Sequence, residues 1–317
     1  MNNFSQSKAH VGISACLLGQ QVRFDGGHKR SPFCANVLAK YVDFVPVCPE
    51  MAIGLGTPRP TIRLIKQEQN VIARTAKGED VTKALVDFGR RTAEQLDFIS
   101  GYIFCAKSPS CGMERVRIYE ENGRGGFKNG VGLYADALMK ARPYLPVEEE
   151  GRLNDPILRE NFVARVYAYH SWQTLARKGL TAADLIDFHA RYKYLLLAHC
   201  PDSYRQLGRL LGNLSEDLQT IADAYLPIFM TALSKPASRK NHSNVLQHLQ
   251  GFFKKRLPSE QRQALGQVIE DYRLGTLPLL APITLIRHLL TQYPAPYIEK
   301  QYYLRPYPDS LSLRYGI

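Results

Sequence analysis

Short apolar runs alternate with amphipathic stretches over residues 11–106, and beyond residue 150 the apolar runs almost disappear. The runs at residues 11–13 and 44–47 have the length of buried strands, whereas residues 81–99 repeat apolar side chains at helical spacing. Alternating strands and helices are typical of an α/β layer with a mostly parallel sheet. The sequence therefore predicts a Rossmann-like α/β N-terminal domain followed by an all-α C-terminal domain.

A change in composition marks the boundary between these two domains. Two prolines and a run of three glutamates interrupt both periodicities at residues 143–151. Such a segment is typical of a linker. We therefore predict an α/β domain over residues 1–147 and a basic all-helical domain over residues 148–317.

Further elements are expected on both sides of this boundary. In the first domain they are a hairpin of residues 62–65 and 71–74, a strand within residues 99–106 and a helix at residues 131–142. In the second domain, helices are expected at residues 156–177 and 240–256. Three more helices are expected to begin at Thr181, near Ser215 and at residues 258–259; the first of them starts with a capping box formed by Thr181 and Asp184 and runs toward His199. The tyrosine- and proline-rich segment after residue 293 is expected to lie extended across the surface.

Three cysteines, Cys16, Cys48 and Cys111, stand where predicted strands run into small-residue or proline turns. Because the carboxyl ends of neighbouring strands converge on one crevice in a doubly wound sheet, thiols far apart in sequence can meet there. Polar groups accompany them, since Glu50 follows Cys48 by two residues and serines flank Cys111. The pattern predicts one metal site with three soft ligands.

A structural alternative exists for every one of these thiols. Free cysteine is among the most buried residue types and often behaves as a small apolar group. The chain contains no C-x-x-C and no C-x-x-C-H, so the spacing argues against a zinc ribbon, a thioredoxin-like site and c-type haem. We assign the other three cysteines, Cys34, Cys105 and Cys200, to packing, although Cys105 shares a predicted strand with the approach to Cys111.

Four separated motifs carry a resemblance to a known family: SACLLG at residues 14–19, RFDG at residues 23–26, CPE at residues 48–50 and KSPSCG at residues 107–112. In this order they resemble the thiouracil desulfidase (TudS) family, over about the first 145 residues. The remainder resembles the YbgA-type domain. The fusion of the two resembles the RudS family of tRNA 4-thiouridine desulfidases.

The resemblance implies a [4Fe-4S] cluster held by three cysteines, with one iron open to the sulfur of the substrate. Carried over motif by motif, the ligands would be Cys16, Cys48 and Cys111. Glu50 and Ser108 would match the family's acid-base and hydrogen-bonding groups.

Three polar residues of the same motifs, Ser14, Asp25 and Ser110, are expected to contact the substrate. The implied reaction is hydrolytic and needs no electron donor: water adds at the thiocarbonyl carbon with Glu50 as general base, and sulfide leaves. Ser108 would donate a hydrogen bond to the developing anion or orient the water.

The charge of the chain indicates a polyanionic partner. The formal net charge is +12, and the part after residue 150 has 21 Lys and Arg against 13 Asp and Glu, whereas the part before it has 20 against 16. That second part also holds 13 of the 18 tyrosines. Basic and aromatic residues together suit RNA, whose phosphates pair with cations and whose unpaired bases stack on rings. Ordinary core tyrosines and solvated lysines are the structural alternative.

We therefore expect an iron–sulfur-dependent tRNA desulfidase that converts 4-thiouridine to uridine, with residues 191–194 and 240–256 as the strongest candidate RNA contacts. Two alternatives remain: a desulfidase of free thiouracil or thionucleoside, and a noncatalytic iron–sulfur protein that senses redox state and binds RNA. A fourth cysteine ligand would favour the latter.

No apolar stretch approaches eighteen residues, and the N-terminus lacks a secretory pattern, so a cytoplasmic protein with no membrane partner is expected. The oligomeric state is left open.

Overall fold

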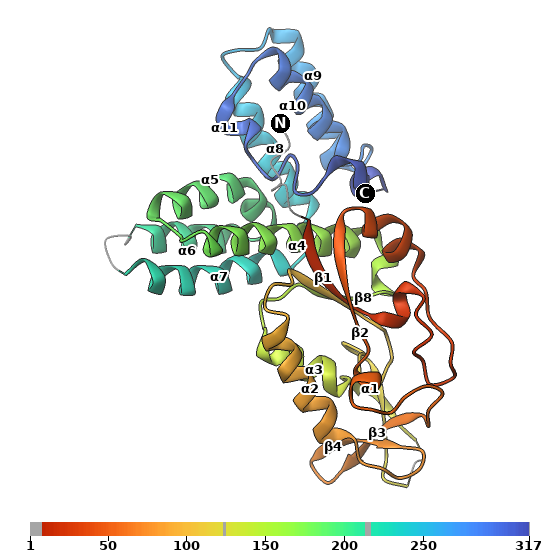
Figure 1. The fold of residues 1–317 in the computed structure, drawn as a ribbon. Helices are drawn as coiled ribbons and strands as arrows, with labels where there is room; N and C mark the ends of the chain where they lie inside the picture. Colours follow the sequence, from red (N-terminus) through yellow and green to blue (C-terminus); the bar gives the residue numbers. More distant parts are fainter. Residues whose placement is uncertain (1–7, 123–124, 213–216, 317) are drawn as a thin grey trace. The chain divides into compact units, whose positions relative to one another are not determined.

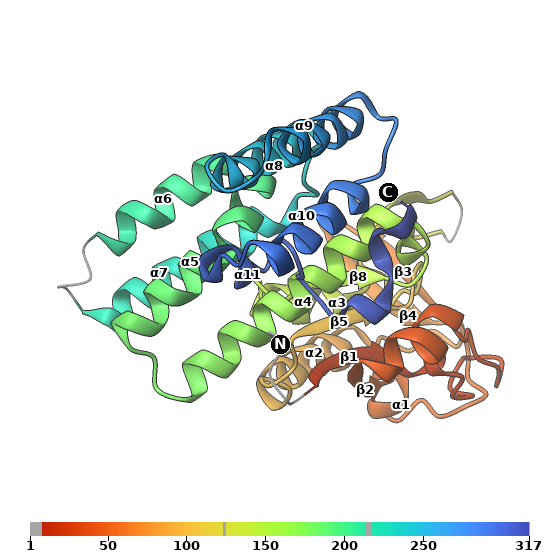
Figure 2. The same ribbon diagram turned by 90° about the horizontal axis from the view of Figure 1, so that it is seen from above.

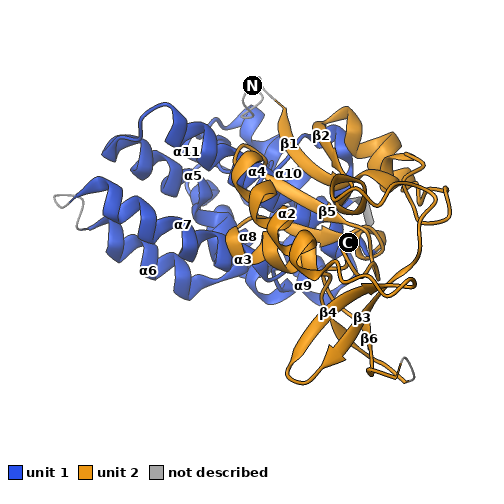
Figure 3. Cartoon of the chain, turned by 60° about the horizontal axis from the view of Figure 1, so that its bottom comes forward, with its two compact units in different colours: residues 1–6, 155–317 blue, residues 7–154 orange. Residues whose placement is uncertain are grey.

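A computed structural model describes residues 8–122, 125–212 and 217–316 of the chain. Contacts between Cα atoms divide the molecule into two units, an α/β unit of Ser7–Asn154 and a helical unit that contains Asp155–Ile317 (Figure 3). The α/β N-terminal part and helical C-terminal part predicted from the sequence are confirmed.

The first sheet of the α/β unit is all parallel. It contains β1 (Ala9–Ser14), β2 (Val42–Val47), β5 (Gly101–Phe104) and β8 (Val147–Glu149), in the order β2-β1-β5-β8 (Figures 1 and 2). Every pair in this order is parallel. All four residues of β5 are buried, as expected of a strand covered on both faces. The carboxyl ends of these strands therefore lie along one edge of the sheet.

A second four-stranded sheet has a mixed pattern. It contains β3 (Ile62–Gln67), β4 (Asn70–Thr75), β6 (Val116–Tyr119) and β7 (Phe127–Gly130), in the order β4-β3-β6-β7. The predicted hairpin is confirmed as the antiparallel pair β3 and β4. The pair β6 and β7, also antiparallel, was not predicted, because its strands are short and three residues of β7 are exposed.

Two helices of the α/β unit pack against each other. They are α2 (Thr82–Gln95) and α3 (Leu133–Ala141), each shorter than predicted. Close packing needs a glycine at Gly89, where a Cβ atom would lie 2.7 Å from the Cβ of Ala137. The four-residue α1 (Pro49–Ala52) follows β2 directly.

In the residues that the structure describes, the helical unit is built from eight α-helices and two short 3-10 helices, Asp309–Leu311 and Leu313–Gly316 (Figure 2). The α-helices are α4 (Pro156–Arg177), α5 (Ala182–His199), α6 (Pro201–Leu211), α7 (Leu218–Ser234), α8 (Arg239–Phe253), α9 (Ser259–Leu274), α10 (Leu280–Gln292) and α11 (Pro296–Glu299). The capping box of Thr181 and Asp184 is present as predicted. The start expected near Ser215 lies outside the described residues, and α7 begins at Leu218 after the cap Asp217.

Aromatic side chains form much of the core of the helical unit. Trp172 is stacked on Tyr225 with ring centroids 5.4 Å apart, and both residues are buried. Tyr192 and Tyr194 are each 2% exposed. The tyrosines of residues 191–194 therefore cannot present their rings to RNA, and the structural alternative is the correct one for them.

The segment after residue 293 does not lie extended across the surface, so this prediction was wrong. Tyr302, Tyr303 and Tyr307 are buried, because large rings gain more from packing against the helices than from solvent. Arg314 secures the segment through an ion pair with Glu160 of α4, at 2.6 Å between Nε and Oε1. The Arg314 guanidinium also donates to the carbonyl of Tyr303.

The predicted linker at residues 143–151 contains strand β8, and the units divide after Asn154 rather than after residue 147. The three glutamates of this segment are buried at 6%, 6% and 9% exposure. Each has hydrogen-bonding partners in the α/β unit, which local composition does not reveal. Within the described residues, none of the helices has the length and apolar character needed to cross a bilayer.

Candidate functional site

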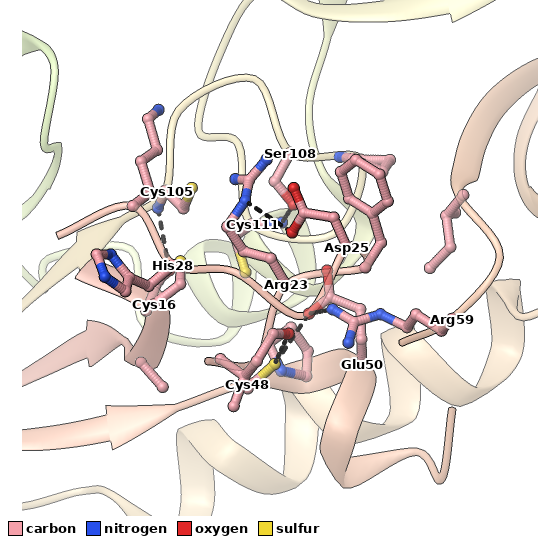
Figure 4. Close-up of a pocket in the computed structure, with 18 of the residues that line it drawn as sticks. Cys16, Arg23, Asp25, His28, Cys48, Glu50, Arg59, Cys105, Ser108 and Cys111 are labelled. Atoms are coloured by element: carbon pink, nitrogen blue, oxygen red, sulfur yellow. Dashed lines mark hydrogen bonds and ion pairs between the residues drawn. The ribbon is translucent and has the colours of Figure 1, made fainter. Parts of the chain in front are cut away.

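A cavity of about 580 Å³ opens at the carboxyl ends of β1, β2 and β5 (Figure 4). Cys16 follows β1 by two residues, Cys48 directly follows β2, and Cys111 follows β5 by seven residues. All three line the cavity, together with Glu50 and Ser108. The convergence that the sequence predicts from parallel topology is therefore present.

Cys16 lies in a 3-10 turn, Ala15–Leu18, which ends at Gly19 with a φ of 96°. A left-handed conformation of this kind favours glycine. The chain then loops outward and returns, since the N–H of Lys29 donates to the carbonyl of Cys16 at 3.0 Å. The returning loop places Arg23 and Asp25 in the wall of the cavity.

Cys48 forms a compact polar group with Glu50 and Arg59. Its Sγ lies 3.3 Å from Oε2 of Glu50, and the same carboxylate oxygen lies 3.7 Å from a guanidinium nitrogen of Arg59. The Arg59 and Glu50 side chains are only 5% and 12% exposed. Burial, followed by the charge of Glu50, raises the pKa of the Cys48 thiol to about 11.

Cys111 is held by a turn that Ser108 organises. The Ser108 Oγ accepts backbone N–H groups from Ser110 at 3.2 Å and from Cys111 at 3.1 Å. Because a hydroxyl also carries one O–H donor, Ser108 can still donate toward the cavity that it lines. Burial raises the pKa of the Cys111 thiol well above its ordinary value.

The N-terminus of α3 supports the same turn. The N–H of Gly132 donates to the carbonyl of Gly112 at 2.7 Å, and the N–H of Leu133 donates to the carbonyl of Pro109 at 3.1 Å. This approach leaves no room for a side chain at Gly132. A Cβ atom there would lie 2.5 Å from the carbonyl carbon of Ser110 and 2.8 Å from the nitrogen of Cys111.

Gly132→Ala is therefore expected to displace the Cys111 turn, because backbone atoms cannot move aside as the end of a flexible side chain can. Overpacking of this kind costs about 1–3 kcal/mol. We expect lower thermal stability and less iron per chain after anaerobic reconstitution. Gly151→Ala is the matched control, since a Cβ atom at Gly151 meets nothing within 4 Å. Wild-type iron content in Gly132→Ala would contradict this account of the turn.

The buried glutamates after β8 fasten the loop that carries Cys111. The Oε1 of Glu149 accepts the N–H of Met113 at 2.8 Å, and the Oε2 of Glu150 accepts the N–H of Ala106 at 2.7 Å. Glu150 also forms an ion pair with Lys29, which lines the cavity. Sequence reasoning missed these supports, because the same acidic run is equally typical of a solvated linker.

The three residues expected to contact substrate have different surroundings. Ser14 lines the cavity, and its Oγ accepts the N–H of Cys105 at 3.0 Å. Asp25 also lines the cavity, and its Oδ1 accepts the N–H of Gly27 at 3.0 Å and lies 3.7 Å from Nε of Arg23. Ser110 is fully buried and does not line the cavity. Its hydroxyl oxygen has no hydrogen-bond partner within the described part of the chain.

The other cysteines differ from one another. Cys34 is fully buried and is not a cavity residue, which fits the packing role predicted for it. Cys200 belongs to the helical unit and accepts a hydrogen bond from Ser203 at 3.2 Å. Cys105, by contrast, lines the cavity, and a hydrogen bond with the Cys16 thiol is the largest cause of its raised pKa. Packing alone therefore does not describe Cys105.

The donor set suits an iron–sulfur cluster, because the thiols of Cys16, Cys48 and Cys111 line one cavity and such clusters take thiolates as ligands. No three His, Cys, Asp or Glu side chains in the described ranges are placed to hold one metal ion. The raised pKa values of Cys48 and Cys111 mean that the protein alone does not favour their thiolate forms. Positively charged iron would reverse this preference.

Comparisons with known proteins divide the chain in the same way. Residues 11–150 match the family described as 2-thiouracil desulfurase, and residues 193–308 match a family described as a protein of unknown function, DUF1722. The chain is 35% identical over 159 residues to the uncharacterized protein YbgA of Escherichia coli (strain K12). The match covers 50% of this chain and 94% of YbgA.

A solved structure, the [4Fe-4S]-dependent thiouracil desulfidase TudS, is 32% identical to this chain. The match covers 47% of this chain and 95% of that structure's chain. The TM-score of the superposition is 0.38. Together, the family matches and the identity to YbgA show that the chain belongs to the 2-thiouracil desulfurase family in its N-terminal part and to the DUF1722, or YbgA-type, family in its C-terminal part.

Proposed function

We propose that the protein is an iron–sulfur-dependent desulfidase that removes sulfur from thiolated uracil in tRNA, converting 4-thiouridine to uridine. One observation carries the proposal. The thiols of Cys16, Cys48 and Cys111 and the Glu50 carboxylate share one cavity at the end of a parallel sheet, in a chain of the 2-thiouracil desulfurase family. The cavity of about 580 Å³ is within the size range of small-molecule sites.

Cys16, Cys48 and Cys111 would hold a [4Fe-4S] cluster with one open iron. When bound, the cluster supplies a soft Lewis acid, which suits the soft sulfur of a thiocarbonyl group. Support for this cofactor comes from the donor set and from the cofactor named for the related TudS. Cys105 borders Cys16, so its thiol is the alternative fourth ligand within the cavity.

Glu50, which lines the cavity, would act as a general base toward a water molecule. Arg59 pairs with the same carboxylate and limits the directions in which it can point. The carboxylate would take a proton from water as the water oxygen bonds to the thiocarbonyl carbon. The C–S bond then breaks, and the overall reaction consumes one water and releases hydrogen sulfide with no change of oxidation state.

Ser108 and Asp25 would act on the pyrimidine. The Ser108 hydroxyl is fixed by two backbone N–H groups, so its remaining O–H has a defined direction for stabilising negative charge on the reacting base. Asp25 is fixed by Gly27 and Arg23, and its carboxylate can accept a hydrogen bond from a ring N–H. The Ser14 hydroxyl accepts the N–H of Cys105 and is expected to hold the backbone at that edge of the cavity in place.

The tRNA part of the proposal rests on charge. The sequence after residue 150 carries an excess of eight basic over acidic residues, on a unit with its own core. Such an excess is of the kind that attracts a phosphate backbone.

The test is anaerobic turnover of 4-thiouridine in purified tRNA by the reconstituted full chain, compared with free 4-thiouridine and free 2-thiouracil. Nucleoside mass spectrometry measures sulfur loss. We expect kcat/KM on tRNA to fall roughly 20- to 40-fold between 50 and 200 mM salt for about three phosphate contacts. Turnover of the neutral substrates is expected to be insensitive to salt.

Two other results would replace the proposal by its alternatives. Equal kcat/KM on free thiouracil and on tRNA, without salt dependence, would indicate a desulfidase of small thiolated molecules. No sulfur loss from any substrate by fully reconstituted protein would indicate a noncatalytic iron–sulfur protein.

A further inference from the structure

Two aromatic rings of the helical unit are exposed side by side. Phe252 and Tyr297 are 43% and 41% exposed, whereas most tyrosines of this unit are buried or half-buried. Their rings are stacked, with centroids 6.0 Å apart and planes inclined by 30°. Phe252 lies in the last turn of α8 and Tyr297 in α11, which runs beside it (Figure 1).

The backbone around both rings is held in place. A guanidinium nitrogen of Arg256 donates to the carbonyl of Pro294 at 2.8 Å and so ties the end of α8 to the segment before α11. The N–H of Ala295 donates to the Glu299 carboxylate at 3.0 Å, which secures the start of α11. The aromatic pair is therefore preorganised, and a partner that stacks on it loses little conformational entropy on binding.

Basic residues follow both Phe252 and Tyr297 closely in the sequence. Lys254, Lys255 and Arg256 follow Phe252 closely, and Lys300 follows α11; all four are exposed. Lys254, Lys255 and Lys300 have no ion pair with any carboxylate of the described residues, so their charges are available to a ligand. The nearby Glu299 carboxylate is engaged with a backbone N–H.

We propose that Phe252 and Tyr297 form a stacking platform for an unpaired base of tRNA, with Lys254, Lys255 and Lys300 as contacts to the adjacent phosphates. The proposal rests on the tRNA substrate proposed above and names the surface that would hold it. Exposed rings among cations are the combination with which proteins bind unpaired nucleotides. A second copy of this chain fits less well, because a symmetric interface through this surface would bring its lysines together.

Binding of tRNA that lacks sulfur tests the platform without any dependence on turnover. We expect Phe252→Ala and Tyr297→Ala each to raise the Kd of the reconstituted full chain by about 5- to 150-fold, the value of one stacked base. The dependence of log Kd on log salt should keep its slope in both variants, because neither ring carries charge. Lys255→Ala is expected to reduce the slope by about one phosphate contact.

Phe252→Tyr should bind tRNA with the Kd of wild type, unlike Phe252→Ala, because it keeps an aromatic ring at this position. Leu274→Ala is the matched control, because Leu274 is an apolar side chain that is 63% exposed. It is the last residue of the 16-residue α9, about 24 Å along that helix from its first residue, Ser259. If wild type binds tRNA and both alanine variants bind it with the same Kd, the stacking platform is contradicted. The proposed desulfidation reaction is not affected by that result.

Two further outcomes would also overturn the platform. If wild type binds no tRNA, the platform fails together with the tRNA substrate, whereas desulfidation of free thiouracil can still be measured. If Phe252→Ala instead dissociates a wild-type dimer in sedimentation experiments, the pair is a self-association surface.

Discussion

Glu50→Gln is expected to reduce kcat by about 10²- to 10⁴-fold while the cluster remains bound, which is the usual effect of removing a general base. Glutamine has nearly the same shape, and its amide N–H can donate to the thiolate that Cys48 becomes as a ligand, since the Cys48 sulfur lies 3.3 Å from Oε2 of Glu50. Glutamine cannot accept a proton from water at neutral pH. Arg59 loses its carboxylate partner but keeps its hydrogen bond to the carbonyl of Gly56 at 2.9 Å, which limits structural damage.

Single-turnover sulfur release, normalised to iron content, separates this chemical effect from poor cluster loading. Glu79→Gln is the matched control, since Glu79 is exposed on the same unit and does not line the cavity. Wild-type turnover in Glu50→Gln would exclude Glu50 as the base. A parallel loss of iron and activity would instead assign it to cluster assembly.

Serine replacement of Cys16, Cys48 or Cys111 is expected to remove most of the bound iron and nearly all activity. Each variant would leave only two of the three proposed ligands, and hard hydroxyl oxygen is a poor substitute for a soft ligand. Iron and sulfide analysis after anaerobic reconstitution, together with the visible absorbance of the cluster, measures the loss. We expect about four iron atoms per wild-type chain, from the composition of a [4Fe-4S] cluster.

Cys34→Ser and Cys105→Ser are the informative companions to these variants. Cys34 is buried away from the cavity, so its replacement tests the cost of losing a buried thiol alone. Cys105 lines the cavity beside Cys16, and we expect Cys105→Ser to keep its iron. Iron loss equal to that of Cys16→Ser would make Cys105 a fourth ligand. It would then favour the redox-sensing alternative, because no iron would be open to substrate.

Local sequence patterns predicted the structure correctly where residues close together in the sequence determine it. Helix α4 occupies the predicted residues, since the Asp155 side chain accepts two N–H groups of its first turn and Pro156 suits a first helical position. The apolar runs before Cys16 and Cys48 are strands as predicted. Parallel topology then places their carboxyl ends at one edge, so the cavity follows from local signals and one rule of sheet geometry.

Local patterns failed where the decisive contacts join distant residues. The acidic run after Val147 suggested a linker, but Glu149 and Glu150 bind backbone groups 36 and 44 residues earlier. Ser110 belongs to a cavity motif, but its side chain is enclosed in the turn and does not line the cavity. The tyrosines of residues 191–194 suggested RNA contacts, but their rings are in the core.

The sequence by itself determined the class of each unit, the strand ends that carry the three thiols, and the capping box that begins α5. These features depend on apolar periodicity and on turn chemistry within a few positions. Only the tertiary structure decided that Cys105 joins the cavity, that buried glutamates fasten its loops, and that Phe252 and Tyr297 remain exposed together. The physical reason is that burial and hydrogen-bond partners are properties of packed neighbours, and these neighbours lie tens of residues apart along the chain.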